Sequence, residues 1–142
     1  MDFHGVKVAV LVGDKLLMHL RDDKPGLFNA NMWDFPGGGR EGNETPEECA
    51  IREIKEEFGI DIVSEVFVWK KEYPAQKDPN QKAVFMVAMV PEDVIKNIKL
   101  TEGQRWSIFD QETFFQDKNV IEALKSRFKD YLESLNSTSH VP

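Results

Sequence analysis

Cysteine is almost absent from this sequence, whose 142 residues include a single one, Cys49, and so permit no internal disulfide. A chain without disulfides suits a reducing environment, and we expect a cytoplasmic protein in which Cys49 is a small buried residue. Long apolar runs are missing too, since no stretch reaches the roughly 18 residues that a membrane-spanning helix requires. The N-terminus lacks a basic region leading into an apolar one, so we expect no signal peptide.

Basic residues are also fewer than acidic ones, since the chain has 18 Lys and Arg against 25 Asp and Glu and a net charge of −7. Binding to a nucleic-acid polymer depends on clustered Lys and Arg, so we do not expect such a polymer as the main partner. A small phosphorylated substrate stays open, because a bound cation can reverse the local field. Length and a hydrophobic content of 41% suit a single domain over residues 1–142 with a core of its own.

The acidic residues are concentrated in residues 38–60, where seven of the 23 are glutamates. Thr45, Pro46 and Glu48 form a helix start, with Thr45 as N-cap, Pro46 at the first helical position and Glu48 closing a capping box. Gly59 is a natural helix end, because glycine adopts the left-handed conformation without a steric penalty. The stretch therefore predicts a helix of about three to four turns between these signals.

One face of the predicted helix gathers Glu53, Glu56 and Glu57, which are neighbours at i, i+3 and i+4 spacing. Taken alone, such a triplet is better explained as the solvated side of an amphipathic helix. The glycine run after Pro36 changes this balance, because backbone without side chains lets a ligand or metal approach closely. A hard divalent cation such as Mg²⁺ would convert the repulsion among the three carboxylates into coordination.

The fixed positions of this stretch resemble the Nudix box, G-x5-E-x7-R-E-U-x-E-E-x-G-U, where U is a bulky aliphatic residue. Every fixed position matches: Gly38, Glu44, Arg52, Glu53, Ile54, Glu56, Glu57, Gly59 and Ile60. The resemblance implies an α/β/α sandwich, with a central mixed sheet between the box helix and a C-terminal helix. It also implies hydrolysis of a nucleoside diphosphate linked to another group.

The resemblance further implies a metal site for Mg²⁺ or Mn²⁺. Glu56 and Glu57 are then the firmest ligands, with help from the backbone carbonyl of Gly37, and Glu53 is a ligand or the general base. Glu102, in an E-G-Q triplet ahead of a tryptophan-bearing strand, resembles the MutT branch, where that loop supplies a further metal-binding or base carboxylate. The sequence does not separate Glu53 from Glu102 as the base.

Two further residues of the box are expected to support that site. Arg52 can hold a box carboxylate with paired hydrogen bonds, although a surface ion pair would also explain it. Glu44 precedes the N-cap, so it more plausibly orients Arg52 or the loop than touches metal. We expect both to act through the ligands that they position.

Candidate substrate contacts lie in the flanks of the box. Arg21 is either a phosphate or base contact or a plain surface arginine. Gly38 would let the substrate approach the backbone, and Trp33 or Phe35 could stack on a base, with core packing as the alternative for each ring. Asn119 resembles the asparagine that reads the guanine edge in the MutT branch, but the local match is imperfect and another alignment would place Asp117 there.

Hydrophobic patterns outside the box predict strands and a second helix. A hairpin is expected from residues 6–12 and 15–20 around Gly13-Asp14, and the apolar residues 82–90 indicate a strand buried on both faces. Further strands are expected at 33–35, 62–73 and 105–108, with connections at 22–31, 74–81 and 110–119. Apolar residues at helical spacing from Val120 to Leu135 predict a C-terminal helix, and residues 134–142 a frayed polar tail.

The MutT-like flanks favour a nucleoside triphosphate that is cleaved to the monophosphate and pyrophosphate. A purine (d)NTP is the expected substrate, with 8-oxo-dGTP as one example, while ADP-ribose, CTP and dinucleoside polyphosphates stay open. A nucleotide sensor without turnover is a second hypothesis, but such proteins commonly lose a box carboxylate and this chain keeps them all. A Nudix isomerase is disfavoured, because such an enzyme uses a catalytic cysteine from another strand, whereas Cys49 lies inside the box helix. Oligomeric state and the number of metal ions are not readable here.

Overall fold

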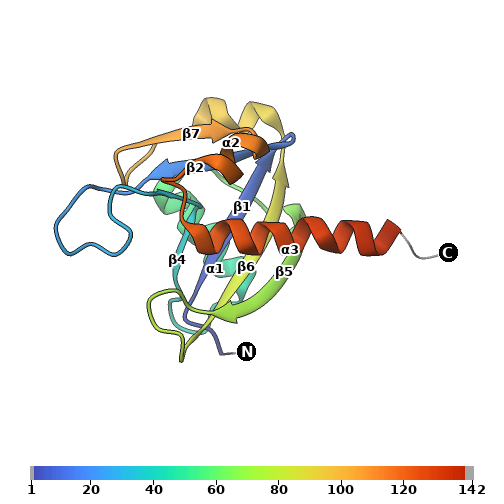
Figure 1. Cartoon of the computed structure of the whole chain (residues 1–142), viewed down its shortest axis with the longest axis horizontal. Coiled ribbons are helices and arrows are strands. Elements are labelled where there is room, and N and C mark those ends of the chain that lie inside the picture. The colour runs from blue at the N-terminus through green and yellow to red at the C-terminus, as the bar shows by residue number, and fades with distance from the viewer. Residues whose placement is uncertain (1, 140–142) are drawn as a thin grey trace.

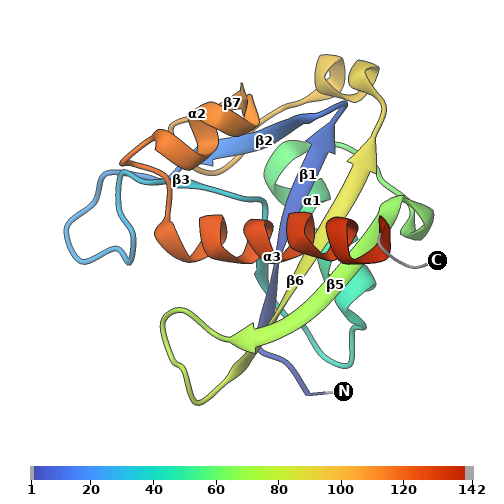
Figure 2. The same ribbon diagram turned by 45° about the vertical axis from the view of Figure 1, so that its right-hand side comes forward.

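The computed structural model describes residues 2–139, with side chains described for residues 2–136. The strands in chain order are β1 (Gly5–Val12), β2 (Lys15–Leu20), β3 (Trp33–Asp34), β4 (Gly37–Gly39), β5 (Phe67–Pro74), β6 (Lys82–Val90) and β7 (Arg105–Phe109). The helices are α1 (Pro46–Phe58), α2 (Gln111–Gln116) and α3 (Glu122–Ser139), with short 3-10 turns η1 (Ser64–Val66) and η2 (Glu92–Asn97). The sheet lies between α1 and α3, which confirms the expected α/β/α sandwich (Figures 1 and 2).

The sheet is mixed and splits where the site is built. Its order is β3-β2-β1-β6-β5, with β1 and β6 parallel and the other pairings antiparallel. β1 and β2 pair only beside their hairpin, at Leu11–Leu16 and Val12–Lys15. Beyond that point they diverge, and β4 pairs with the start of β1 while β3 pairs with the end of β2. The glycine strand is therefore inserted into the sheet next to β1.

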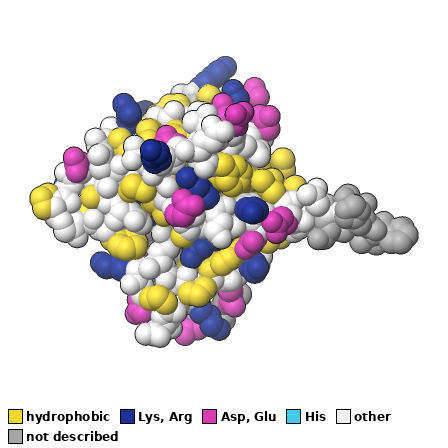
Figure 3. Space-filling view, in the orientation of Figure 1, with side chains coloured by type: hydrophobic (Ala, Val, Ile, Leu, Met, Phe, Trp, Pro, Cys, Tyr) yellow, Lys and Arg dark blue, Asp and Glu magenta, His cyan; other side chains and the backbone are white. Residues whose placement is uncertain are grey.

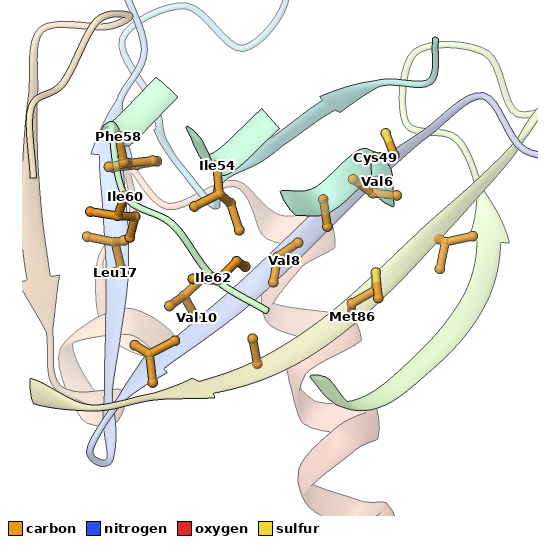
Figure 4. Close-up of a cluster of buried hydrophobic side chains, with 14 of the residues drawn as sticks. Val6, Val8, Val10, Leu17, Cys49, Ile54, Phe58, Ile60, Ile62 and Met86 are labelled. Atoms are coloured by element: carbon orange, nitrogen blue, oxygen red, sulfur yellow. The ribbon is translucent and has the colours of Figure 1, made fainter. Parts of the chain in front are cut away.

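Alternation along β1 divides the core into two layers. Val6, Val8 and Val10 face α1 and pack with Ile54 and Phe58 (Figure 4). Ala9 and Leu11 face the opposite way, into the layer that contains Phe35, Phe85 and several α3 residues. Strand β6 contributes to both layers, which confirms the prediction that residues 82–90 form a strand buried on both faces. Lys7, the polar residue within the valine-rich run, lies on the α3 side of β1.

Three predicted boundaries were wrong. Strand β5 begins at Phe67 and not at residue 62, because Ile60 and Ile62 are buried in the α1 layer (Figure 4) and the chain makes turn η1 before it pairs. The connection at 110–119 contains α2, since the Asp110 side chain accepts a hydrogen bond from the Thr113 N–H at 2.8 Å and caps a helix. Helix α3 continues to Ser139, so the expected tail begins inside it; residues 140–142 lie outside the described residues.

No helix within residues 2–139 is long and apolar enough to cross a membrane. On the face of the molecule that carries α3, basic and acidic side chains are interspersed and do not gather into one broad patch of either sign (Figure 3).

Candidate active site

Helix α1 starts and ends where its local sequence requires. The Glu48 N–H donates to Thr45 Oγ1 at 3.1 Å and the Thr45 N–H to Glu48 Oε1 at 2.9 Å, which completes the predicted capping box. Gly59 ends the helix with φ of 69°, and its N–H reaches the Lys55 carbonyl at 2.9 Å. The buried face of α1 packs on β1, so its glutamate face meets β4 at the edge of the helix.

Glu57 is the most deeply placed of the box glutamates, with 3% of its surface exposed. Its Oε1 accepts a hydrogen bond of 2.8 Å from the Gly37 N–H. Glu57 thus contacts the N–H group of Gly37, whereas the sequence analysis expected the Gly37 carbonyl to help bind the metal. Burial raises the pKa of Glu57 to about 8, because the charged form is held in a poorly hydrated place.

Glu53 lies directly under the glycine strand. A Cβ atom added to Gly38 would come within 2.5 Å of the Glu53 carboxyl carbon, so only glycine leaves room for this approach. Burial raises the pKa of Glu53, and the charges of Glu56 and Glu102 raise it further, whereas Arg52 lowers it. Glu102 thus contributes to the electrostatic environment of Glu53.

Glu102 is brought to the box by the segment that precedes it. The Lys99 N–H donates to the Phe58 carbonyl at 2.8 Å, and the Thr101 N–H to the Glu57 carbonyl at 2.9 Å. These bonds satisfy free carbonyls at the C-terminal end of α1 and fix residues 99–101 there. The exposed Glu102 side chain follows immediately, on the same end of the helix as Glu53, Glu56 and Glu57.

Arg52 connects the acidic residues. Its Nε and Nη2 donate to the two oxygens of Glu44, at 2.7 and 3.0 Å, and its Nη1 donates to Glu53 and Glu56, at 3.1 Å each. Nη2 also reaches the Gly39 carbonyl at 2.8 Å. The paired bonds to Glu44 hold the pKa of that carboxyl down to about 2. The expected pairing of Glu44 with Arg52 is thus present.

The carboxylates fit a hard divalent cation by their chemistry. Within residues 2–136, no three His, Cys, Asp or Glu side chains are grouped so that they could hold a metal ion as they stand. Arg52 binds Glu53 and Glu56, and the Gly37 N–H binds Glu57. All the available donors are oxygens, the type that Mg²⁺ and Mn²⁺ prefer. The charge of Glu53 also raises the pKa of Glu57, so their mutual repulsion would fall if a cation came between them.

His19 was missed by the sequence reasoning. It is 4% exposed on β2, its Nε2 lies 3.3 Å from the Phe35 carbonyl oxygen and 3.8 Å from Glu57 Oε2, and its Nδ1 has no partner among the described residues. Burial lowers the pKa of His19, which favours the neutral ring. The available signal was a titratable residue within the apolar run 16–20. Cys49 is buried as expected, and burial raises the pKa of its thiol to about 12.

A cavity of about 730 Å³ opens on the α3 side of the glycine strand. Gly38 and Gly39 border it at one end, and loops 22–31 and 75–81, which project on the same side of the molecule, form its walls (Figure 1). Asp34 lies in this wall and is 1% exposed, and its Oδ2 accepts hydrogen bonds from Lys7 Nζ at 2.8 Å and from Arg21 Nη1 at 3.3 Å. The sequence reasoning named Arg21 but neither Lys7 nor Asp34, although Lys7 interrupts an apolar strand.

The two aromatic side chains expected to contact a base, Trp33 and Phe35, lie outside the cavity. Phe35 is fully buried and stacks on Phe114, with ring centres 5.2 Å apart, so the packing alternative applies to it and no ring face is left for a base. Trp33 is 8% exposed and packs on Phe109. Both rings lie outside the described lining of the cavity, where the aromatic side chain is the partly exposed Phe28.

Asn119 also lies outside that lining. Its carbonyl accepts a hydrogen bond of 2.7 Å from the Trp33 N–H, and its side chain is exposed beside the start of α3. The Asn119 N–H also donates to Asp117 Oδ1 at 2.8 Å, so both hydrogen bonds of Asn119 use its backbone, and the bond to Trp33 ties the segment before α3 to β3. A role in reading a base stays a prediction.

Comparisons with known proteins agree with this arrangement. The model of the NUDIX domain matches residues 3–129. The 8-oxo-dGTP diphosphatase of Proteus vulgaris is 60% identical over 31 residues, which are 22% of this chain and 28% of that enzyme. An RNA pyrophosphohydrolase of Hydrogenovibrio crunogenus is 28% identical over 128 residues, covering 78% of this chain and 76% of that enzyme. The crystal structure of the MutT protein from Methanosarcina mazei superposes with a TM-score of 0.70 at 21% identity, over 99% of this chain and 97% of that chain.

Proposed function

The chain belongs to the family of NUDIX domains, and on that premise we propose that it is a pyrophosphohydrolase of nucleoside triphosphates that depends on Mg²⁺ or Mn²⁺. The proposed substrate is a purine (d)NTP, with 8-oxo-dGTP within that class, and the products are the nucleoside monophosphate and pyrophosphate. The likeness to the Proteus 8-oxo-dGTP diphosphatase, which extends over 31 residues, supports this choice.

The proposal depends on one observation: the acidic cluster (Glu53, Glu56 and Glu57) and the cavity both border the glycine strand β4. Glu53 and Glu57 reach Gly38 and Gly37 from the α1 side, and the cavity borders Gly38 from the α3 side. A substrate with its nucleoside in the cavity could lay its phosphates over β4, where no side chain obstructs them. The phosphates would then lie beside the carboxylates that are proposed to hold the cation.

The box glutamates, Arg52 and Glu102 have different roles in the proposed reaction. A divalent cation bound by Glu53, Glu56 and Glu57 would neutralise phosphate charge and lower the pKa of a bound water. Arg52 keeps Glu53 and Glu56 oriented through hydrogen bonds of 3.1 Å each. The proton of the attacking water goes to a carboxylate, for which Glu53 and Glu102 are the two candidates.

A screen of nucleotides with Mg²⁺ or Mn²⁺ tests the proposal, with release of phosphate scored against release of pyrophosphate. The panel contains purine and pyrimidine (d)NTPs, 8-oxo-dGTP, ADP-ribose and a dinucleoside polyphosphate. Pyrophosphate released from a purine (d)NTP supports the proposal. A protein that binds nucleotide tightly but turns over none of the panel is a sensor, and the proposal is then wrong.

The Glu57→Ala variant serves as the matched control for that screen. Because Glu57 is proposed to hold the cation, this variant should fold and lose turnover. Glu53→Gln and Glu102→Gln, compared at several pH values, separate the two candidate bases. Removal of the true base should lower kcat and abolish the acid limb of its pH profile, and the other variant should retain that limb.

A further inference from the structure

Arg127 differs from the other cations that line the cavity. It comes from α3 and is 6% exposed. Its Nη2 donates to the Pro74 carbonyl at 2.8 Å, and its guanidinium carbon lies 4.8 Å from the centre of the Tyr73 ring. Within residues 2–136, no Asp or Glu side chain pairs with it, and burial lowers its pKa. Asp78 lines the same cavity, but among residues 2–136 no carboxylate forms an ion pair with the buried Arg127 guanidinium.

The cations at the glycine end of the cavity are arranged differently. Lys7 and Arg21 both contact Asp34, so their charges are partly compensated inside the protein. A buried charge without such a partner is costly, and proteins usually pair it. The fold nevertheless places Arg127 under the loop 75–81. A counter-charge supplied by a ligand would explain why this position is occupied by arginine.

The free N–H groups of Arg127 reach open space. Among the described side chains, the fully buried polar atoms without a partner are His19 Nδ1 and Asp34 Oδ1. The N–H groups of Arg127 that do not bind Pro74 are not among them, so the protein does not seal them. The open space beside them is the cavity that Arg127 lines, and a molecule in the cavity can therefore accept these hydrogen bonds.

Arg127 is also far from the acidic cluster. Tyr73, which it covers, belongs to β5, and the glycines belong to β4. The strands β4, β1, β6 and β5 are successive neighbours in the sheet. Three spacings of about 4.8 Å place roughly 14 Å between β4 and β5. A substrate with its scissile phosphates at β4 would therefore extend its nucleoside, ribose substituents included, towards Arg127.

We propose that Arg127 binds a second phosphate of the substrate, carried on the ribose of the nucleotide whose 5′ phosphates lie at β4. This inference rests on the proposed function and narrows its substrate class to nucleotides that carry a further phosphate on the ribose besides the 5′ phosphates. A planar guanidinium matches a phosphate with two parallel hydrogen bonds, and the phosphate supplies the missing counter-charge. Lys77 and Asp78 at the exposed rim of the same wall carry opposite charges, so the proposed phosphate contact depends on Arg127 itself.

The test uses pairs of compounds that differ in one group: GTP and ATP, each with and without a 3′-phosphate. We measure kcat/KM with Mg²⁺, and the Kd of the corresponding α,β-methylene analogues. The wild type should favour the 3′-phosphorylated member about tenfold to a hundredfold, as expected for a charged hydrogen bond. Arg127→Met should abolish this preference and Arg127→Lys should keep part of it. Lys129→Met, an exposed cation on the same helix, should leave it unchanged.

The preference is the ratio of the kcat/KM values of the two members of a pair, measured on the same variant. A partial loss of folded protein lowers both values equally and leaves the ratio unchanged. A wild type that does not distinguish the members of a pair overturns the inference. So does an Arg127→Met variant that weakens both members equally, because Arg127 would then contact the shared nucleoside or only support Tyr73 and Pro74. If the analogues show the preference but no nucleotide is hydrolysed, the inference stands and the proposed hydrolase activity fails.

Discussion

Replacement of Glu57 by glutamine should make the protein without metal more stable at neutral pH. The carboxylate is 3% exposed and its pKa is about 8 in the folded state, against about 4.5 when unfolded. An acid with a raised pKa in the folded state loses its proton first in the unfolded chain. Its contribution to stability therefore falls as pH rises from about 4.5 to about 8, and is constant above that range.

The size of the effect follows from the same two values. A pH of 7 lies about 2.5 pH units above the unfolded-state pKa, so the free energy of unfolding is lower there by about 3 kcal/mol than at pH 4.5. Glutamine keeps an oxygen for the Gly37 N–H but cannot ionise, so Glu57→Gln should recover that free energy. For a chain of this size the melting temperature should rise by roughly 10 °C. At pH 4.5 the two proteins should melt within a few degrees of one another.

Calorimetry in EDTA at pH 4.5, 7 and 8.5 measures this difference directly. Glu56→Gln is the matched control, because the Glu56 side chain is 53% exposed and its neutralisation should change stability little. Added Mg²⁺ should stabilise the wild type most at pH 8.5, where Glu57 is ionised, and Glu57→Gln least. A difference between wild type and Glu57→Gln that does not change with pH would refute the reasoning.

Other substitutions test other parts of the site. Gly38→Ala should lower kcat/KM strongly, because its Cβ would meet the Glu53 carboxylate at 2.5 Å, whereas Gly39→Ala has open space and should be mild; equal losses would contradict this account. Arg52→Lys should keep the fold and lower kcat/KM by about 10- to 100-fold, as removal of a group that orients metal ligands does, and an unchanged rate would argue against that role. Cys49 should resist alkylation at pH 8 until the protein unfolds, since its thiol is buried with a pKa of about 12, and fast labelling of the folded protein would show that the site is open.

Much of the fold could be predicted because its signals are local. The capping residues around Thr45 and Gly59 act within one helical turn, and the apolar run 82–90 needs no partner to be recognised as a buried strand. Prediction failed where burial or a cap overrode the apparent pattern. Ile62 alternates as if in a strand but packs under α1, and Asp110 starts a helix within a segment that lacks strong periodicity.

The sequence by itself determined the acidic face of α1, because Glu53, Glu56 and Glu57 are placed by helix geometry alone. The tertiary structure decided which distant groups meet that face: β4 enters the split between β1 and β2, and residues 99–101 bind the end of α1. It also buried Phe35 and turned Arg127 towards the cavity. Such contacts depend on strand order and on the packing of elements far apart in the chain, which no short-range pattern encodes.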